Sequence, residues 1–326
     1  MTRLRIPDDV LSAAHARARA RGQRDWTEAD RLRGEIEAAG WKVVDRGTDF
    51  ALSPASAPDL VEAGGRRYGS SASVPSRLAD APVGVATIVV VAGDAPARLE
   101  QVIGTLREHA PDGTQLVIVG DDPRPEQAAA LDRIERDSEQ PSVPTEIIRT
   151  SAPLGRAAAL NAGIRRATAP IVVLLDASVE PTGDLVTPLV AALRDPTVAV
   201  AGSPGLVSGD LRRFLPAPAG DVDAIGGGCQ AFRREDYIAR GPLDERFLHP
   251  ASLDAWWSLA LRDGGEEGQH RRAVAFDDLP LRHREDGPAN VSGTDHERLA
   301  KRNFYRLIDR FGWRRDLLTG RPSRQS

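Results

Sequence analysis

The chain has 326 residues, of which 41% are hydrophobic and 28% charged, and its formal net charge is −4. This length allows two domains, the composition excludes a wholly disordered chain, and the charge excludes a protein that binds polyanions with its whole surface. Cys229 is the single cysteine, so intrachain disulfides and cysteine-based zinc sites are excluded. The longest apolar run, residues 170–175, is too short to cross a bilayer. We therefore expect a cytoplasmic protein without stable membrane insertion, which could still associate peripherally with the inner face of a membrane.

Residues 1–53 read as a separate small unit. The pattern predicts two helices at 8–20 and 27–39, followed by short strands at 41–45 and 50–52. The first helix carries a local basic cluster that could contact phosphates. We favour a solvated helical face instead, because acidic residues balance the charge of the unit, and nucleic acid is not an expected partner. The basic residues are His15, Arg17, Arg19, Arg21 and Arg24.

Residues 54–84 are rich in Pro, Ala, Ser and Gly and show no sustained period, so they read as a linker. A larger domain is expected at 85–310, with a C-terminal tail at 311–326, although a helical pattern runs from 295 to 318. Continuous apolar strands alternate with helices in the first half of this domain, which predicts an α/β fold with a mostly parallel sheet covered on both faces. The expected strands are 86–91, 115–119, 146–148 and 171–175, and the expected helices are 97–109, 126–136 and 157–167.

Acidic residues follow two of these strands directly. Asp121 comes after the second strand and Asp176 after the fourth, while Gly155 and Arg156 lead into a helix. Ligands of parallel sheets bind at the carboxyl ends of the strands. A carboxylate there can accept hydrogen bonds from a nucleobase or ribose, or it can bind a divalent cation. The alternative for each carboxylate is a helix cap.

The order of these motifs resembles a family-2 glycosyltransferase of the GT-A type. The matching segments are Leu-Gly-Arg-Ala-Ala-Ala-Leu-Asn-Ala-Gly-Ile at 154–164, Val-Val-Leu-Leu-Asp-Ala-Ser-Val-Glu-Pro at 172–181 and Gly-Gly-Gly-Cys at 226–229. A Leu-Asp pair at 253–254 precedes an amphipathic helix. The resemblance implies a GT-A, Rossmann-like domain and a nucleotide-sugar donor.

The resemblance also implies site residues. It places donor binding at Asp121, Arg156, Asn161 and Asp176, with Asp121 on the base. It implies a Mn²⁺ or Mg²⁺ site made by Asp176, Ser178 and His283, and Asp254 as catalytic base. His283 could equally be a surface residue, and Asp254 could be a helix cap. As the first residues of a helix, Asp254 and its neighbours would meet the positive end of the helix dipole, which lowers a carboxylate pKa.

Three positions depart from the pattern of the family. Ser178 stands where the family has a second metal carboxylate, Leu253 where it has a Glu, and Ala92-Gly93-Asp94 where it has Pro-Thr-Tyr-Asn. A site with fewer carboxylates binds hard cations more weakly. We expect an inverting transferase of the hexosyltransferase class with an unknown acceptor. A non-catalytic nucleotide-sugar-binding homologue is the second hypothesis.

The N-terminal unit has a resemblance of its own. Ala-Asp-Arg-Leu-Arg at 29–33 and Gly-Trp-Lys-Val-Val-Asp at 40–45 resemble the C-terminal end of a cysteinyl-tRNA synthetase over about 40 residues. An RNA-binding adaptor that acts through this unit is the third hypothesis.

Overall fold

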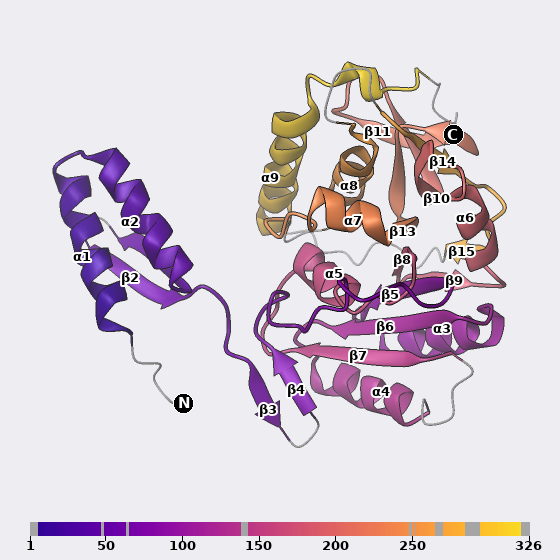
Figure 1. Ribbon diagram of the computed structural model, residues 1–326, viewed down its shortest axis with the longest axis horizontal. Helices are drawn as coiled ribbons and strands as arrows, with labels where there is room; N and C mark the ends of the chain where they lie inside the picture. Colours follow the sequence, from indigo (N-terminus) through magenta and orange to yellow (C-terminus); the bar gives the residue numbers. More distant parts are fainter. Residues whose placement is uncertain are drawn as a thin grey trace. The chain divides into compact units, whose positions relative to one another are not determined.

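The computed structural model describes residues 6–46, 49–62, 65–137, 143–247, 250, 252–264, 270–283 and 294–320. The chain divides into two compact units, Met1–Pro58 and Asp59–Ser326 (Figure 1). Each unit is described by itself.

The smaller unit consists of two helices and a two-stranded antiparallel sheet, as the sequence predicts. Its elements are α1 (Asp8–Gly22), α2 (Trp26–Ala38), β1 (Trp41–Arg46) and β2 (Asp49–Pro54). Val10, Ala14, Ile36 and Trp41 form its core. The second helix starts one residue earlier than expected, because the Asp25 side chain caps it by accepting a hydrogen bond from the Glu28 amide at 3.0 Å.

Much of the predicted basic cluster is engaged within this small unit. Arg17 is 5% exposed and pairs with Asp45 at 2.7 Å, and Arg21 pairs with the same carboxylate. The His15 ring packs edge-on against Phe50, with 5.0 Å between ring centroids. These contacts explain three of the five basic residues by internal packing. They weaken the argument for a phosphate-binding surface on α1.

The larger unit is built on one twisted sheet. Among the described residues its strand order is β12-β14-β10-β13-β8-β5-β6-β7-β4-β3, with β11 paired to β10. Strands β8, β5, β6, β7 and β4 run parallel to one another, whereas β3 is antiparallel to β4, and β13 is antiparallel to both β8 and β10. The strands of this sheet are β3 (Leu60–Glu62), β4 (Gly65–Tyr68), β5 (Ala86–Val91), β6 (Thr114–Gly120), β7 (Thr145–Thr150), β8 (Ile171–Asp176), β10 (Val198–Ser208), β11 (Phe214–Ala217), β12 (Gly220–Val222), β13 (Ala224–Arg233) and β14 (Arg272–Ala275). A separate ladder joins β9 (Val179–Pro181) to β15 (Leu281–His283).

Helices cover both faces of this sheet, which confirms the predicted α/β architecture (Figure 1). Successive residues of β5 point to opposite faces: Val89 belongs to a core cluster that includes residues of α5, α8 and α9, whereas Ile88 and Val90 belong to a cluster that includes residues of α3, α4 and α6. The continuous apolar strands follow from this burial on two sides. The helices are α3 (Pro96–His109), α4 (Pro125–Arg136), α5 (Arg156–Ile164), α6 (Val186–Ala192), α7 (Arg234–Arg240), α8 (Leu253–Arg262) and α9 (Thr294–Phe311), followed by a short 3₁₀ helix at Arg315–Leu317.

The strand order reverses between β5 and β8. From β5 the chain builds outward through β6 and β7, and it then returns to place β8 on the other side of β5. Such a switch point opens a crevice at the carboxyl ends of the two strands, where ligands bind. Asp176 ends β8 and pairs in register with Val91 of β5, so it lies at the switch point.

The predicted linker at 54–84 is wrong for most of its length. Residues from Asp59 onward belong to the larger unit, where β4 extends the sheet by parallel pairing with β7. Val74 is fully buried in the core. The prediction failed because β4 is polar and joins the edge of the sheet through backbone hydrogen bonds, which leave no apolar period in the sequence.

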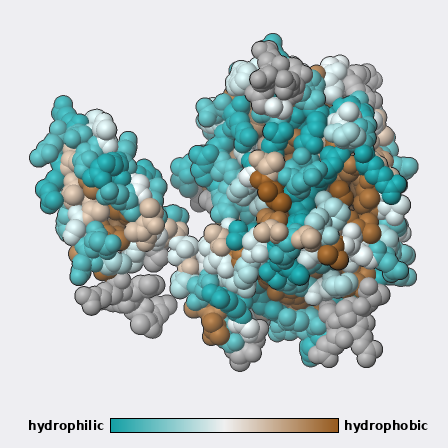
Figure 2. All heavy atoms as spheres, viewed as in Figure 1, coloured by the Kyte–Doolittle hydropathy of each residue, from teal (hydrophilic) through white to brown (hydrophobic). Residues whose placement is uncertain are grey.

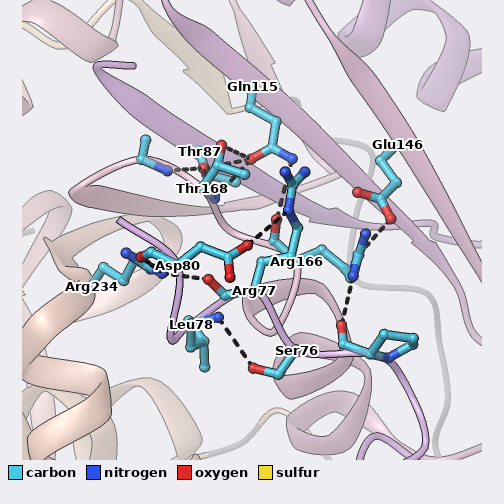
Figure 3. Close-up of polar contacts among 12 residues, drawn as sticks. Ser76, Arg77, Leu78, Asp80, Thr87, Gln115, Glu146, Arg166, Thr168 and Arg234 are labelled. Atoms are coloured by element: carbon cyan, nitrogen blue, oxygen red, sulfur yellow. Dashed lines mark hydrogen bonds and ion pairs between the residues drawn. The ribbon is translucent and has the colours of Figure 1, made fainter. Parts of the chain in front are cut away.

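Arginine side chains bind the segment 75–80 to the larger unit (Figure 3). Arg166 donates to the Pro75 carbonyl at 2.8 Å and to Glu146 at 2.6 Å. Arg234 donates to the carbonyls of Arg77 and Asp80 at 2.5 and 2.9 Å. The segment is therefore an integral strap on the α/β unit.

The C-terminal tail was predicted to begin at residue 311, but the packed part of the larger unit extends beyond this residue. Phe311 and Leu317 are fully buried, and Arg314 is 2% exposed with ion pairs to Asp263 and Asp316 at 2.5 and 2.9 Å. The long helical pattern breaks at Gly312, where a Cβ would lie 2.6 Å from the Ile308 carbonyl oxygen. The chain is thus packed at least to Leu317.

The visible surface of both units is mainly hydrophilic, with small separate apolar patches (Figure 2). Within the described ranges, no helix combines the length and the apolar character needed to cross a membrane.

Candidate active site

The centre of the candidate site is an ion pair at the switch point. Arg156, the first residue of α5, donates to Asp176 Oδ2 at 2.9 Å. The other oxygen, Asp176 Oδ1, accepts the amide of Ser178 at 2.9 Å, while the Ser178 residue itself is exposed. The sequence predicted both Arg156 and Asp176 as donor-site residues, and the structure brings them together.

Asp121 shapes the loop that leads into α5. Its Oδ1 accepts hydrogen bonds from the Leu154 amide at 2.8 Å and the Thr150 hydroxyl at 3.0 Å, and its Oδ2 accepts the Gly155 amide at 3.0 Å. Gly155 has φ 88°, a conformation that glycine adopts without steric cost. Asp121 therefore lies at the same sheet edge as Asp176 and fixes the position from which Arg156 projects.

Asp254 is the second residue of α8, and Ser252 occupies the N-cap position. The helix docks on β13 through buried polar contacts: the Gln230 amide donates to Ser258 Oγ at 2.8 Å and to the Asp254 carbonyl at 3.2 Å. The Asp254 carboxylate faces Gly227 of β13, where an added Cβ would lie 2.4 Å from Oδ2. Asp254 is thus not the N-cap that the alternative interpretation required.

The electrostatics of Asp254 differ from the sequence-based expectation. Burial raises the pKa of its carboxyl to about 6, the negative charge of Asp176 adds to this rise, and the positive charge of Arg156 opposes it. The helix dipole was expected to lower the pKa. Loss of water around the carboxylate outweighs the dipole, which contributes only about 0.3–1 kcal/mol at exposed helix ends. A carboxylate that titrates near neutral pH is suited to general-base work.

Asn161, predicted to bind the donor, is a structural residue. It is 1% exposed, and its amide nitrogen donates to the Leu243 carbonyl at 2.9 Å and to Glu245 at 3.0 Å. Its oxygen accepts from the Tyr237 hydroxyl and the Leu243 amide, both at 3.0 Å. These four bonds use both donors and both acceptor sites of the amide, so the Asn161 side chain has none left for the predicted contact with the donor. Asn161 instead ties α5 to the 243–245 loop.

Only part of the predicted metal site can be tested against the structure. His283 ends β15 and is in register with Val179, so its backbone adjoins the residue after Ser178, but its side chain lies outside the described residues. Within the described part of the chain, no three His, Cys, Asp or Glu side chains gather in a way that could hold a metal ion. Asp176 already carries a guanidinium, and Ser178 offers a neutral hydroxyl. These residues do not fit a divalent cation, which favours charged oxygen ligands.

Sequence reasoning missed part of the same sheet edge. A pocket of about 280 Å³ opens where β5 and β6 end, and its lining includes Asp94, Arg124 and Gln127. Asp94 pairs with Arg124, and Gln127 donates to the Gly93 carbonyl at 2.8 Å. A Cβ on Gly93 would lie 3.9 Å from the Ala177 Cβ, so this turn adjoins the one after β8. Asp94, the charged residue directly after Gly93, is the sequence signal that could have identified this part of the sheet edge.

Gly227→Ala tests the placement of Asp254. The new Cβ would require the Asp254 carboxylate to move. If Asp254 is the base that the sequence predicts, we expect about a 10- to 100-fold loss of the predicted sugar transfer, because a 1 Å misplacement of a catalytic group can cost about 10²-fold. Gly226→Ala is the matched control, since its Cβ would meet Pro204 at 3.1 Å and not Asp254. Release of nucleoside diphosphate from donor sugars measures the effect. Equal rates in the two variants would contradict the close approach of Asp254 to Gly227.

The fold and the site together define an α/β protein with charged side chains at the switch point of its sheet, where Arg156 pairs with Asp176. Residues 87–241 match the family model "Glycosyl transferase family 2", and this part of the chain belongs to that family. The prediction from the sequence is thereby confirmed at the level of family and fold.

One solved structure supports this fold with a TM-score above 0.5. The chain is similar to GalNAc-T7, solved with UDP, GalNAc and Mn²⁺, with 15% identity and a TM-score of 0.56 over 70% of this chain and 48% of that one. It also matches the mannosyltransferase PcManGT from Pyrobaculum calidifontis, solved with GDP-Man and Mn²⁺, with 20% identity and a TM-score of 0.49 over 66% of this chain and 61% of that one. The chain thus spans about half to three fifths of these proteins.

Two short matches concern another class of protein. The chain is 45% identical over 40 residues to cysteine–tRNA ligase 1 of Burkholderia lata, and 42% identical over 50 residues to the cysteine–tRNA ligase of Opitutus terrae. These matches cover 12% and 15% of this chain, and 8% and 11% of the ligases.

Proposed function

We propose that this protein transfers a sugar from a nucleoside-diphosphate-sugar to the hydroxyl of an acceptor, with inversion at the anomeric carbon. The observation that carries the proposal is the carboxylate of Asp254, with a pKa near 6, beside the Arg156–Asp176 pair at the switch point. Membership of residues 87–241 in a glycosyltransferase family supports the reaction class.

In the proposed reaction Asp254 takes the proton of the acceptor hydroxyl. The hydroxyl oxygen forms a bond to the anomeric carbon while the bond from that carbon to the diphosphate oxygen breaks. The electron pair of the broken bond goes to the nucleoside diphosphate, whose growing negative charge is stabilised by a positive group near the start of α5. The dipole of α5, whose positive end lies at Arg156, adds to this stabilisation.

A titration of donor nucleotides tests the binding half of this proposal. In calorimetry with nucleoside diphosphates and nucleotide sugars, the wild-type protein is expected to bind at least one member of the panel. Asp121→Asn should weaken this binding about tenfold or more, because it removes a charged acceptor that we propose for the base or ribose. The asparagine keeps one oxygen for the loop amides.

Asp122→Asn is the matched control for this experiment. Asp122 is exposed and pairs with Arg67 at 3.3 Å, and asparagine tolerates its positive φ of 47°. Equal affinity in the wild type and both variants would contradict the role of Asp121. Binding without any turnover would favour the second hypothesis, a non-catalytic nucleotide-sugar-binding protein.

A further inference from the structure

The positive charge at the switch point is fixed by the protein itself. Arg156 is held at the start of α5 by a loop whose two amides are bound to Asp121. Its side chain is 16% exposed, and its guanidinium reaches Asp176 at 2.9 Å. The protein therefore supplies a positive charge at this place without a metal ion from solution.

Among the residues that the structure describes, the acidic groups around Arg156 are too few to hold a second cation. Asp176 Oδ2 is bound to the guanidinium and Oδ1 to the Ser178 amide. Among the described residues, Asp254 is the other carboxylate whose charge acts on this place, and its oxygens face Gly227 of β13. A divalent ion at Asp176 would therefore meet one shared carboxylate, a neutral hydroxyl and the repulsion of a guanidinium.

We propose that Arg156, and not a divalent cation, neutralises the donor diphosphate, so that nucleotide binding in this protein is independent of metal. This inference rests on the proposed function. The planar guanidinium of arginine matches two phosphate oxygens with parallel N–H bonds and stays charged at every physiological pH. Asp176 then orients Arg156 in the empty site, and the diphosphate competes with Asp176 for the same donors.

Calorimetric titration of the full chain with UDP, GDP, ADP, CDP and dTDP, each in EDTA and in Mn²⁺, tests the inference. We expect the dissociation constant of the best nucleotide in EDTA to lie within about threefold of that in Mn²⁺. Arg156→Gln should raise the dissociation constant in EDTA about 10- to 100-fold, the usual effect of losing a hydrogen bond to a charged group. Asp176→Asn should leave it unchanged or lower it, because a competing negative charge is removed.

Arg133→Gln is the matched control, since Arg133 forms an ion pair with Glu100 at 2.6 Å between α3 and α4. It should bind like the wild type, and thermal melting of each variant checks that it is folded. Binding that needs Mn²⁺, is lost in Asp176→Asn and survives in Arg156→Gln would overturn the inference and leave the proposed function in place. The absence of binding by every nucleotide in both conditions would overturn both.

Discussion

Asp254→Asn is expected to lower sugar transfer by about 10²- to 10⁴-fold, the usual contribution of a general base. Asparagine has nearly the same shape and keeps the helix intact, but it cannot accept the proton of the acceptor. Because the pKa of Asp254 is raised to about 6, the wild-type rate should rise with pH through this value and level off above it. The rate of nucleoside diphosphate release, measured between pH 4.5 and 8, should lose this dependence in the variant.

The same substitution should stabilise the protein at neutral pH. A folded-state pKa above the unfolded value of 3.8 means that the ionised carboxylate is disfavoured in the fold. This penalty is absent below pH 3.8, grows as the pH rises, and is complete above about pH 6. Its full size is about 3 kcal/mol, at 1.36 kcal/mol for each pKa unit. Asp254→Asn removes the penalty, so its melting temperature should exceed that of the wild type by several degrees at pH 8 and match it near pH 4.

Asp112→Asn provides the matched control for both measurements. Asp112 is exposed in the turn before β6, at the amino end of that strand and away from the switch point. It should leave the rate and the melting temperature unchanged. Wild-type turnover in Asp254→Asn would show that Asp254 is not the base, whatever its effect on stability.

The parts of the fold that the sequence predicted are those with a local signal. Strands β5, β6 and β8 are apolar along their whole length because both faces of the sheet are covered, and an acidic residue directly after an apolar strand marked Asp121 and Asp176. Strand β4 has no such signal. Its residues are exposed or half-buried, and its place is set by pairing with β7, about 80 residues further along the chain.

The predictions for Asn161 and for the pKa of Asp254 failed because both depend on tertiary packing. Asn161 was assigned from its motif, yet every residue from Ala157 to Ile164 is buried, and a helix that is buried all round must satisfy an asparagine internally. The pKa of Asp254 depends on the close approach of β13 at Gly227 and on the charges of Arg156 and Asp176, which no local pattern contains. The dipole of α8 is a local feature, and it gave the wrong sign.

A chain that begins at Asp59 is expected to fold, whereas a chain that begins at Ser76 is expected to lose most of its stability. The first keeps the whole larger unit. The second loses β3 and β4, the side chain of Val74 and the carbonyl partners of two arginines, since Arg165 donates to Val74 and Arg166 to Pro75, both at 2.8 Å. These half-buried arginines would lose the acceptors of the two bonds.

The expected loss of stability follows from these contacts. Burial of one valine contributes about 1.5–3 kcal/mol, and each hydrogen bond from a charged donor about the same. The sum is on the order of 5 kcal/mol or more, comparable with the whole stability of an ordinary domain, about 5–15 kcal/mol. Circular dichroism melts of the two truncated chains measure the difference.

Single substitutions in the full chain separate the contribution of the core residue from that of the edge strands. Val74→Ala should lower the free energy of unfolding by about 1–3 kcal/mol, because it removes buried methyl groups from a packed core. Val61→Ala is the matched control, since Val61 lies in β3 and is 84% exposed, and it should change the stability by less than about 0.5 kcal/mol. If the chain from Ser76 melted like the chain from Asp59, residues 59–75 would cover the sheet without supporting it, and the domain boundary would lie at the strap formed by residues 75–80.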